Sequence, residues 1–301
     1  WRSKNDSSTS SPGLATPFKS LQIGEEGGGA GLLPIIASEH IVPGELLGGR
    51  ALREWRRAVV HGTDVIVSRQ RSDDNPPAAT RRANLQAYAL LRHPHIVTLL
   101  AATTHGEVIT EVCDYDLLPA PGPSSGSAKE ERRRSISLLR MLAYARDIAQ
   151  ALAWAHSMHV IHRDVKPSHW LVVGNRAKLG GWMFAEVQRG DMHPKPDDHF
   201  HGTPLYMGKP MVGFGLAMWE VIHNDFAFSG FDDLLAFREA VTDRMERPLL
   251  SDDTMPVAVN RLIARCWAQS PAQRPTMLEV VASLTRIITA LELLAGTTSV
   301  Q

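Results

Sequence analysis

The sequence predicts an α+β protein with two lobes, a small β-rich lobe followed by a mainly helical one. Short runs rich in β-branched residues, 64–67 and 108–110, flank a helical pattern in the first half of the chain. In the second half, apolar residues recur at helical spacing over 138–152 and 278–294. A run rich in Pro, Gly and Ser over 119–134 separates the halves, so we expect a surface connection there.

The composition of the whole chain excludes several classes of partner. With 301 residues, 44% of them hydrophobic, the chain can bury a sizeable core. Its 32 basic and 32 acidic residues balance, so no overall field attracts nucleic acid or an acidic membrane surface. We therefore expect protein partners that recognise local surfaces, and no nucleic acid.

Two features bear on the compartment. Cys113 and Cys266 are the only cysteines, too few for a disulfide framework, which indicates a reducing, intracellular and most simply cytoplasmic environment. No run of about 18 apolar residues is present, so the chain shown is not expected to span a membrane. Because the sequence begins at Trp1 rather than Met, an upstream segment that tethers the protein to a membrane stays open beside an arbitrary start.

The composition also predicts domain boundaries. Residues 1–40 are rich in Ser and Gly and read as a disordered linker. The β-rich lobe is expected over 41–116, a flexible insert over 117–134, the helical lobe over 135–294, and a short tail over 295–301.

One motif carries most of the functional information. Residues 160–173 read Val-Ile-His-Arg-Asp-Val-Lys-Pro-Ser-His-Trp-Leu-Val-Val, which resembles the catalytic loop of protein kinases. Further landmarks of that family lie on both sides of this motif in the correct order, at 91–97, 109–111, 202–207, 214–221 and 266–275. The resemblance covers roughly 41–294 and implies the bilobal protein-kinase fold. Lys166, two residues after Asp164, is similar to the pattern of tyrosine-kinase-like Ser/Thr kinases.

The resemblance implies which retained residues form the site. Asp164 takes the position of the base that accepts the substrate hydroxyl proton, with Lys166 and Thr203 at the other retained catalytic positions. The positions that contact the nucleotide in the family are Gly48, Thr110, Glu111, Cys113 and Leu171.

Four catalytic positions are degenerate. The lysine that pairs the nucleotide phosphates is replaced by Ser68, and its carboxylate partner on the helix by Asn84. Arg69 is adjacent, but neighbouring strand residues point to opposite faces, so it is not expected to replace the lysine. The two metal-ligand positions hold His169 and Gly181, and neither offers the hard oxygen that Mg²⁺ prefers. Losing both halves of the lysine–carboxylate pair together avoids leaving one charge unpaired.

The nucleotide pocket is also altered. Only the first glycine of the phosphate-binding loop, Gly48, stands in register. Trp55 replaces the valine expected above the adenine, and Ile66 replaces an alanine beside it, so added bulk is expected to close the pocket. We therefore expect no cofactor, with ATP and Mg²⁺ bound only if the protein is an enzyme after all.

Two other features of the sequence bear on metal binding. His169 could bind a softer metal than Mg²⁺, but a structural side chain is the simpler interpretation. A cluster of imidazoles and carboxylates is interpreted as a solvated loop rather than a metal site, and consists of His193, Asp197, Asp198, His199 and His201. No metal is expected.

The activation segment is short. Between Met207 and Phe214 the chain lacks the Ala-Pro-Glu motif and about a dozen residues that the kinase family places there. Arg274, which pairs with the glutamate of that motif in the family, would lose its partner. Either the protein lacks the substrate platform, or a stretch was lost from the predicted coding sequence.

A candidate regulatory site lies between the lobes. Arg132, Arg133 and Arg134 precede Ser135, close to a helix expected to begin near Leu138. A phosphate at a helix N-terminus is favoured by the free amides and the dipole. The alternative is a solvated basic run without a regulatory role.

Two functional classes therefore compete. The first is a pseudokinase that acts as a signalling scaffold or allosteric partner, with an active kinase or its substrate as the expected partner. The second is an unconventional protein Ser/Thr kinase that uses Asp164 as base and holds ATP in another way. A non-functional gene product is a third possibility.

Overall fold

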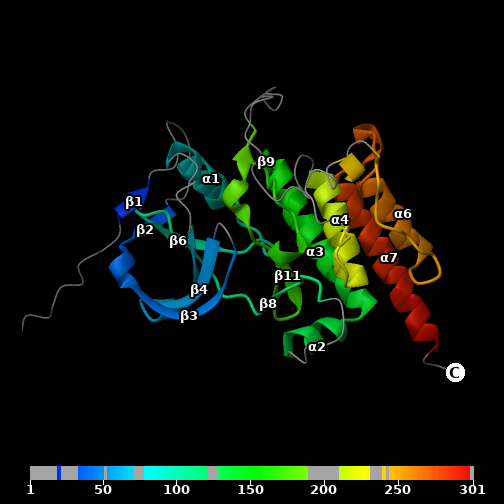
Figure 1. Cartoon of the computed structure of the whole chain (residues 1–301), viewed down its shortest axis with the longest axis horizontal. Helices are drawn as coiled ribbons and strands as arrows, with labels where there is room; N and C mark the ends of the chain where they lie inside the picture. Colours follow the sequence, from blue (N-terminus) through cyan, green and yellow to red (C-terminus); the bar gives the residue numbers. More distant parts are fainter. Residues whose placement is uncertain are drawn as a thin grey trace, which may run out of the picture.

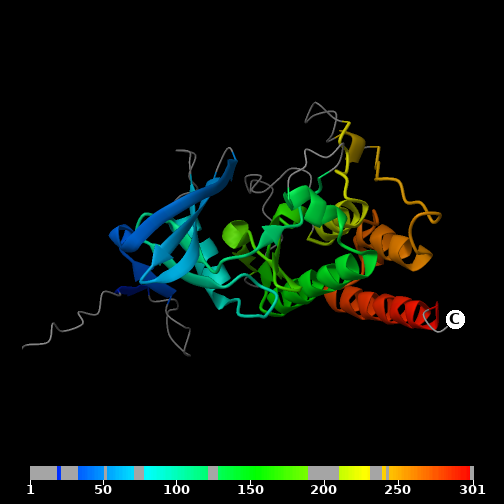
Figure 2. The ribbon, with the colours of Figure 1, turned by 90° about the horizontal axis from the view of Figure 1, so that it is seen from below.

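The computed structural model confirms the predicted α+β, two-lobed architecture (Figure 1). The structure describes residues 19–21, 33–50, 53–70, 78–120, 128–188, 210–230, 239–241 and 244–298. Among these residues, the first part of the chain forms a sheet with one helix, and the second part is built mostly from helices, as Figure 2 shows from below.

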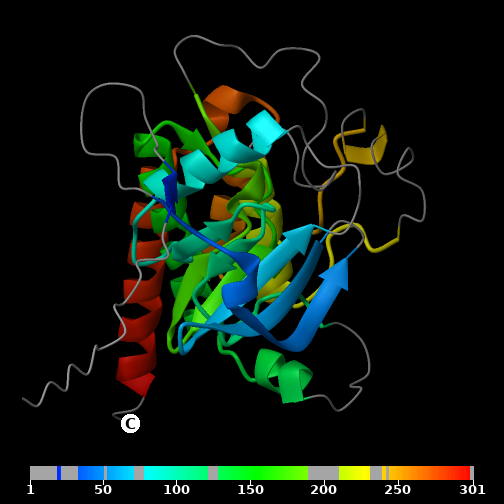
Figure 3. The ribbon, with the colours of Figure 1, turned by 90° about the vertical axis from the view of Figure 1, so that its left-hand side faces the viewer.

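The small lobe is a seven-stranded sheet in the order β1-β2-β6-β7-β5-β4-β3. The strands are β1 (Lys19–Leu21), β2 (Leu33–Ile36), β3 (Ile41–Arg50), β4 (Arg53–Val60), β5 (Thr63–Gln70), β6 (Leu99–Thr103) and β7 (Val108–Thr110). A 3₁₀ turn, η1 (Ser38–His40), follows β2, and helix α1 (Ala78–Leu90) follows β5. Figure 3 shows the sheet toward the viewer with α1 above it.

Residues 33–36 correct the expected N-terminal boundary. Ile35 and Ile36 of β2 pair in parallel with Ala102 and Thr103 of β6, and Ile36 is 2% exposed. The folded lobe therefore includes part of the segment predicted to be a linker. The prediction failed because a short apolar run in a Gly- and Ser-rich segment gains its stability from a distant strand. Residues 1–18 and 22–32 lie outside the described part of the chain.

The large lobe combines long helices with short strands. Its helices are α2 (Ala128–Arg134), α3 (Leu138–Ser157), α4 (Pro210–His223), α6 (Val257–Cys266) and α7 (Met277–Thr298). Its strands are β8 (Tyr115–Asp116), β9 (Val160–Ile161), β10 (Trp170–Val173), β11 (Arg176–Leu179) and β12 (Glu186–Val187). Its 3₁₀ turns are η2 (Pro167–His169), η3 (Trp182–Phe184) and η5 (Pro271–Gln273).

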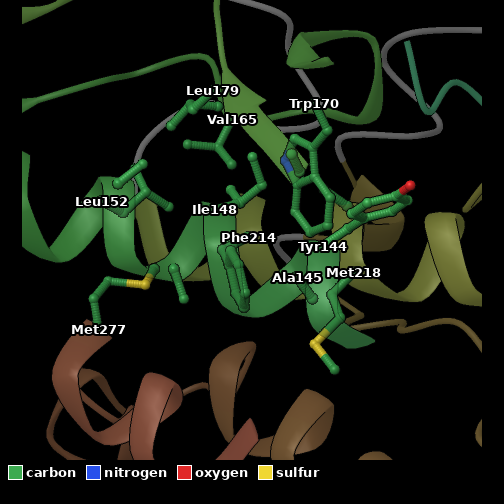
Figure 4. Packing of buried hydrophobic residues seen from close by; sticks show 14 of the residues in the cluster. Tyr144, Ala145, Ile148, Leu152, Val165, Trp170, Leu179, Phe214, Met218 and Met277 are labelled. Carbon is green, nitrogen blue, oxygen red and sulfur yellow. The ribbon is translucent and has the colours of Figure 1, made fainter. Parts of the chain in front are cut away.

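Helix α3 organises the core of this lobe, with α4 and α7 packed against it (Figure 1). Its residues Ala145, Ile148 and Leu152 are fully buried, which confirms the helical spacing read from the sequence (Figure 4). Trp170 stacks on Phe214 of α4 with ring centroids 5.6 Å apart. This packing holds β10, and with it the catalytic loop that precedes it, against a rigid support. None of the helices in the described residues is long and apolar enough to cross a bilayer.

The insert expected to be flexible over 117–134 is structured at both ends. Leu117 is fully buried, and its backbone N–H donates to the Trp170 carbonyl at 2.9 Å. Arg133 of α2 is 2% exposed and donates from Nη2 to the Val221 carbonyl at 2.7 Å. Both residues are buried by partners far away in the sequence, so composition did not reveal them. Residues 121–127 fall outside the described ranges.

Helix α3 begins at Leu138, as the sequence predicted, but Ser135 is bound to the helix that precedes it. The Ser135 hydroxyl donates to the Arg132 carbonyl at 2.8 Å, and so closes the end of α2. Helix α3 is capped instead by Ser137, whose side chain accepts from the Arg140 N–H at 3.3 Å. A phosphate on Ser135 would therefore stand at a helix C-terminus, where the dipole disfavours it.

Candidate functional site: a degenerate nucleotide cleft

The catalytic loop between β9 and η2 is held from within by a neutral histidine. His162 is fully buried; its Nε2 donates to the Gly180 carbonyl at 2.7 Å, and its Nδ1 accepts from the Asp164 N–H at 3.1 Å. Burial, together with the neighbouring His169, lowers the pKa of His162 to about 3, so the imidazole is uncharged at neutral pH. His162 therefore serves to connect the loop to the segment after β11.

Asp164 and Lys166, two retained positions, form an ion pair. Lys166 Nζ lies 2.7 Å from Asp164 Oδ2, and the Asp164 side chain is 2% exposed. Burial alone would raise the pKa of Asp164, but the positive charges of His169 and Lys166 outweigh it and lower the pKa. Asp164 is thus an ionised, buried carboxylate.

His169 and Gly181, the two degenerate metal positions, pack directly against each other. His169 Nδ1 donates to the Asp164 carbonyl at 2.8 Å, so this nitrogen carries a proton. Gly181 has a φ of +78°, and a Cβ added there would lie 2.2 Å from His169 Nδ1. The imidazole therefore fills the space that a side chain at position 181 would need.

These two residues do not fit the Mg²⁺ that the kinase fold implies. Gly181 has no side-chain ligand, and His169 offers an imidazole in place of a hard oxygen, with its Nδ1–H already donated to the Asp164 carbonyl. Within the described ranges, no group of three or more His, Cys, Asp or Glu side chains is arranged to hold a metal. Thr203 and the cluster from His193 to His201 lie outside those ranges.

Strand β5 places Ser68, which stands at the position of the family's lysine, on the face of the sheet that points away from the small-lobe core. Val65 and Val67 are buried in the small-lobe core, so Ile66 and Ser68 point to the other face. Ser68 pairs in register with Trp55 of β4. As predicted, Arg69 points away from this face, where its guanidinium Nη2 lies 2.9 Å from the Glu107 carboxylate.

Asn84, at the second degenerate position, makes a neutral contact between the lobes. Its Nδ2 donates to the Met183 carbonyl of η3 at 2.7 Å. Tyr88, one turn further along α1, stacks on Trp182 with ring centroids 6.2 Å apart. Helix α1 is thus held against the segment after β11 by an amide hydrogen bond and an aromatic pair.

The residues expected to contact a nucleotide at the connection between the lobes lie next to one another, but they interact with other protein groups. The Glu111 carboxylate accepts from Lys178 Nζ at 2.6 Å and from the Thr98 N–H at 2.7 Å. Burial would raise the pKa of Glu111, but these bonds lower it. Burial is the main reason that the pKa of the Cys113 thiol is raised to about 12. The thiol is therefore protonated and unreactive. Thr110 lies in β7, paired with both Leu99 and Ile66.

The remaining contacts of this region are Leu171 and Gly48. Leu171 lies on β10. The carbonyl of the next residue, Val172, accepts from the Asp114 N–H at 2.8 Å, so Leu171 is adjacent to the connection between the lobes. At Gly48, an added Cβ would meet no atom within 4 Å. The retained glycine is therefore not required by packing in this structure.

The sequence reading missed Arg53. Its Nη1 donates to Ser68 Oγ at 2.7 Å, which brings a cation to the position of the absent lysine. Burial lowers the pKa of Arg53 to about 10, a value at which it stays charged at neutral pH. Strand periodicity could have revealed it, because Arg53 lies two residues before Trp55 and therefore shares its face.

Arg274 forms hydrogen bonds with backbone carbonyls near it in the sequence. Arg274, expected to lose a carboxylate partner, donates from Nε to the Ala268 carbonyl at 2.7 Å and from Nη2 to the Gln269 carbonyl at 3.0 Å. Two backbone acceptors thus satisfy the guanidinium locally.

Known proteins resemble the chain over most of its length. The family described as "Protein kinase domain" matches residues 65–284. The chain is 26% identical to dual specificity protein kinase shkD of Dictyostelium discoideum over 274 residues, 85% of this chain and 36% of the relative. It is 26% identical to dual specificity protein kinase shkA of the same organism over 289 residues, 90% of this chain and 54% of the relative.

A plant protein is similar as well. Serine/threonine/tyrosine-protein kinase HT1 of Arabidopsis thaliana is 29% identical over 213 residues, 64% of this chain and 51% of the relative. The chain spans between 36% and 54% of the length of these three relatives. With a family match over residues 65–284 and the predicted two-lobed fold, the chain belongs to the protein kinase family.

Proposed function

We propose that this protein is a pseudokinase, a kinase-fold domain impaired in phosphoryl transfer that acts as a signalling scaffold or allosteric partner. The packing of His169 against Gly181 carries the proposal. Restoring a metal carboxylate at 181 requires His169 to leave, since its ring lies 2.2 Å from the added Cβ. The two losses are therefore coupled through one contact.

The consequence for catalysis is large. Phosphoryl transfer depends on the metal to neutralise charge on the transferring group. Each ~1.4 kcal/mol of lost transition-state stabilisation costs about tenfold in rate, and metal stabilisation amounts to several kcal/mol. With Ser68 and Asn84 also in place of the lysine and glutamate, the loss affects nucleotide positioning as well.

The alternative function is an unconventional protein Ser/Thr kinase. The observation that favours it is the ion pair of Asp164 with Lys166 at 2.7 Å, which preserves an ionised base beside a cation. The relatives, named as dual specificity kinases, are consistent with such an origin.

The partners proposed for the scaffold are proteins, either an active kinase or its substrate. An intracellular location fits the two cysteines, both of which are free thiols in the structure.

Phosphoryl transfer tests the proposal directly. Purified protein is incubated with radiolabelled ATP and Mg²⁺, then with Mn²⁺, in the presence of a general protein substrate. We expect incorporation no higher than that of the Asp164→Asn variant. Transfer by the parent that Asp164→Asn abolishes would establish the kinase alternative instead.

A further inference from the structure

A cation and a hydroxyl from two neighbouring strands meet on one face of the small-lobe sheet. Arg53 of β4 donates to Ser68 of β5 at 2.7 Å. Trp55 is the registered partner of Ser68, and Arg53 lies diagonally from it on the same face. The opposite face of these strands buries Ala58 and Val65 in the small-lobe core. Arg53 and Ser68 therefore share the face that the kinase resemblance assigns to the nucleotide.

The pair offers hydrogen-bond donors and no negative charge. A guanidinium has five N–H donors, and one of those of Arg53 is used by Ser68 Oγ. The Ser68 hydroxyl accepts that bond and keeps its own hydrogen as a donor. Across the residues that the structure describes, Arg53 has this hydroxyl as its hydrogen-bond partner and forms no ion pair.

The electrostatic state of Arg53 also favours an anion. Burial lowers its pKa to about 10, and among the described residues no carboxylate offsets this loss of hydration. A partly desolvated cation gains most when an anion approaches it. Phosphate suits this group well, because the planar guanidinium binds two phosphate oxygens at once.

We propose that Arg53 and Ser68 form a metal-independent site for a polyphosphate group. Arg53 replaces from β4 the charge that β5 lost at position 68. The inference rests on the proposed function, because a cleft without metal ligands must offset phosphate charge with protein cations alone. Since Trp55 and Ile66 add bulk at the adenine position, the phosphates are the recognised part, whether free or carried by a nucleotide.

Calorimetric titration of the full chain in EDTA tests the site, with inorganic tripolyphosphate, ATP and adenosine as ligands. We expect tripolyphosphate and ATP to bind and adenosine not to bind. Arg53→Gln should weaken binding of both phosphates by about tenfold or more, the loss of a charge-assisted contact. ATP binding more tightly than tripolyphosphate, with the same dependence on Arg53, supports the site and identifies a nucleotide as its occupant.

Arg57→Gln is the matched control, because Arg57 lies on the same strand and face, opposite Ile66, and is exposed. It removes the same charge from β4, so a general field effect would weaken binding equally in both variants. Arg53→Lys keeps the charge without the planar fork and should retain part of the affinity. The unfolding temperature of each unliganded variant reports whether it is folded.

The site is overturned if the folded parent binds neither phosphate, or if Arg57→Gln weakens binding as much as Arg53→Gln does. Adenosine binding as tight as ATP would also overturn it. So would Mg²⁺ tightening the binding by more than about tenfold, because that is the signature of a metal-bridged site. Failure here is distinguishable from failure of the pseudokinase proposal, which is decided by phosphoryl transfer and not by binding.

Discussion

Gly181→Ala is expected to lower the free energy of unfolding by about 2 to 4 kcal/mol. Part of the cost comes from a φ of +78°, which a residue with a Cβ adopts unfavourably. The larger part comes from His169, whose ring atoms lie 2.2 to 2.4 Å from the added Cβ. Urea denaturation of parent and variant gives the difference.

Gly174→Ala is the matched control, because Gly174 also has a positive φ, +58°, and its added Cβ would meet no atom within 4 Å. It should cost only about 1 kcal/mol. Adding His169→Ala to Gly181→Ala should reduce the cost of the glycine substitution to that of the control. Equal costs at positions 174 and 181 would show that His169 does not occupy the space of a side chain at 181.

Asp164→Ala is expected to destabilise the protein by about 3 kcal/mol or more, because it removes the carboxylate that is paired with a largely buried lysine. The Lys166 side chain is 18% exposed and lies 2.7 Å from Asp164. This carboxylate stabilises the loop through its ion pair, so its removal affects folding whether or not the protein transfers phosphate. Adding Lys166→Met should recover part of the loss in urea denaturation, and a purely additive result would contradict the coupling.

The same carboxylate gives a pH dependence. The pKa of Asp164 is lowered in the folded protein, so its contribution to stability is present above the unfolded value of about 3.9 and is lost as pH falls through the folded value. The unfolding free energy of the parent should therefore fall more steeply below about pH 4 than that of Asp164→Asn. Parallel curves for the two proteins would show that Asp164 is not held as a carboxylate.

The sequence was sufficient for the features that depend on local pattern. Alternation along β5 placed Ser68 and Arg69 on opposite faces, and helical spacing identified the buried side of α3. The separated landmarks of the kinase family along the chain predicted the fold and the degenerate positions 68, 84, 169 and 181. Each of these inferences uses residues close together in the chain or a spacing that geometry dictates.

The tertiary structure was needed wherever a residue's role depends on a distant partner. Three contacts join segments that composition treats separately. They are Leu117 with Trp170, Arg133 with Val221, and strand β2 with strand β6. The placement of Arg53 beside Ser68 also required the register of β4 and β5. The sequence by itself thus determined the family and the residues that are missing from its site. Only the folded chain decided what replaces them, because a vacated position is filled by whichever side chain the packing brings within contact distance.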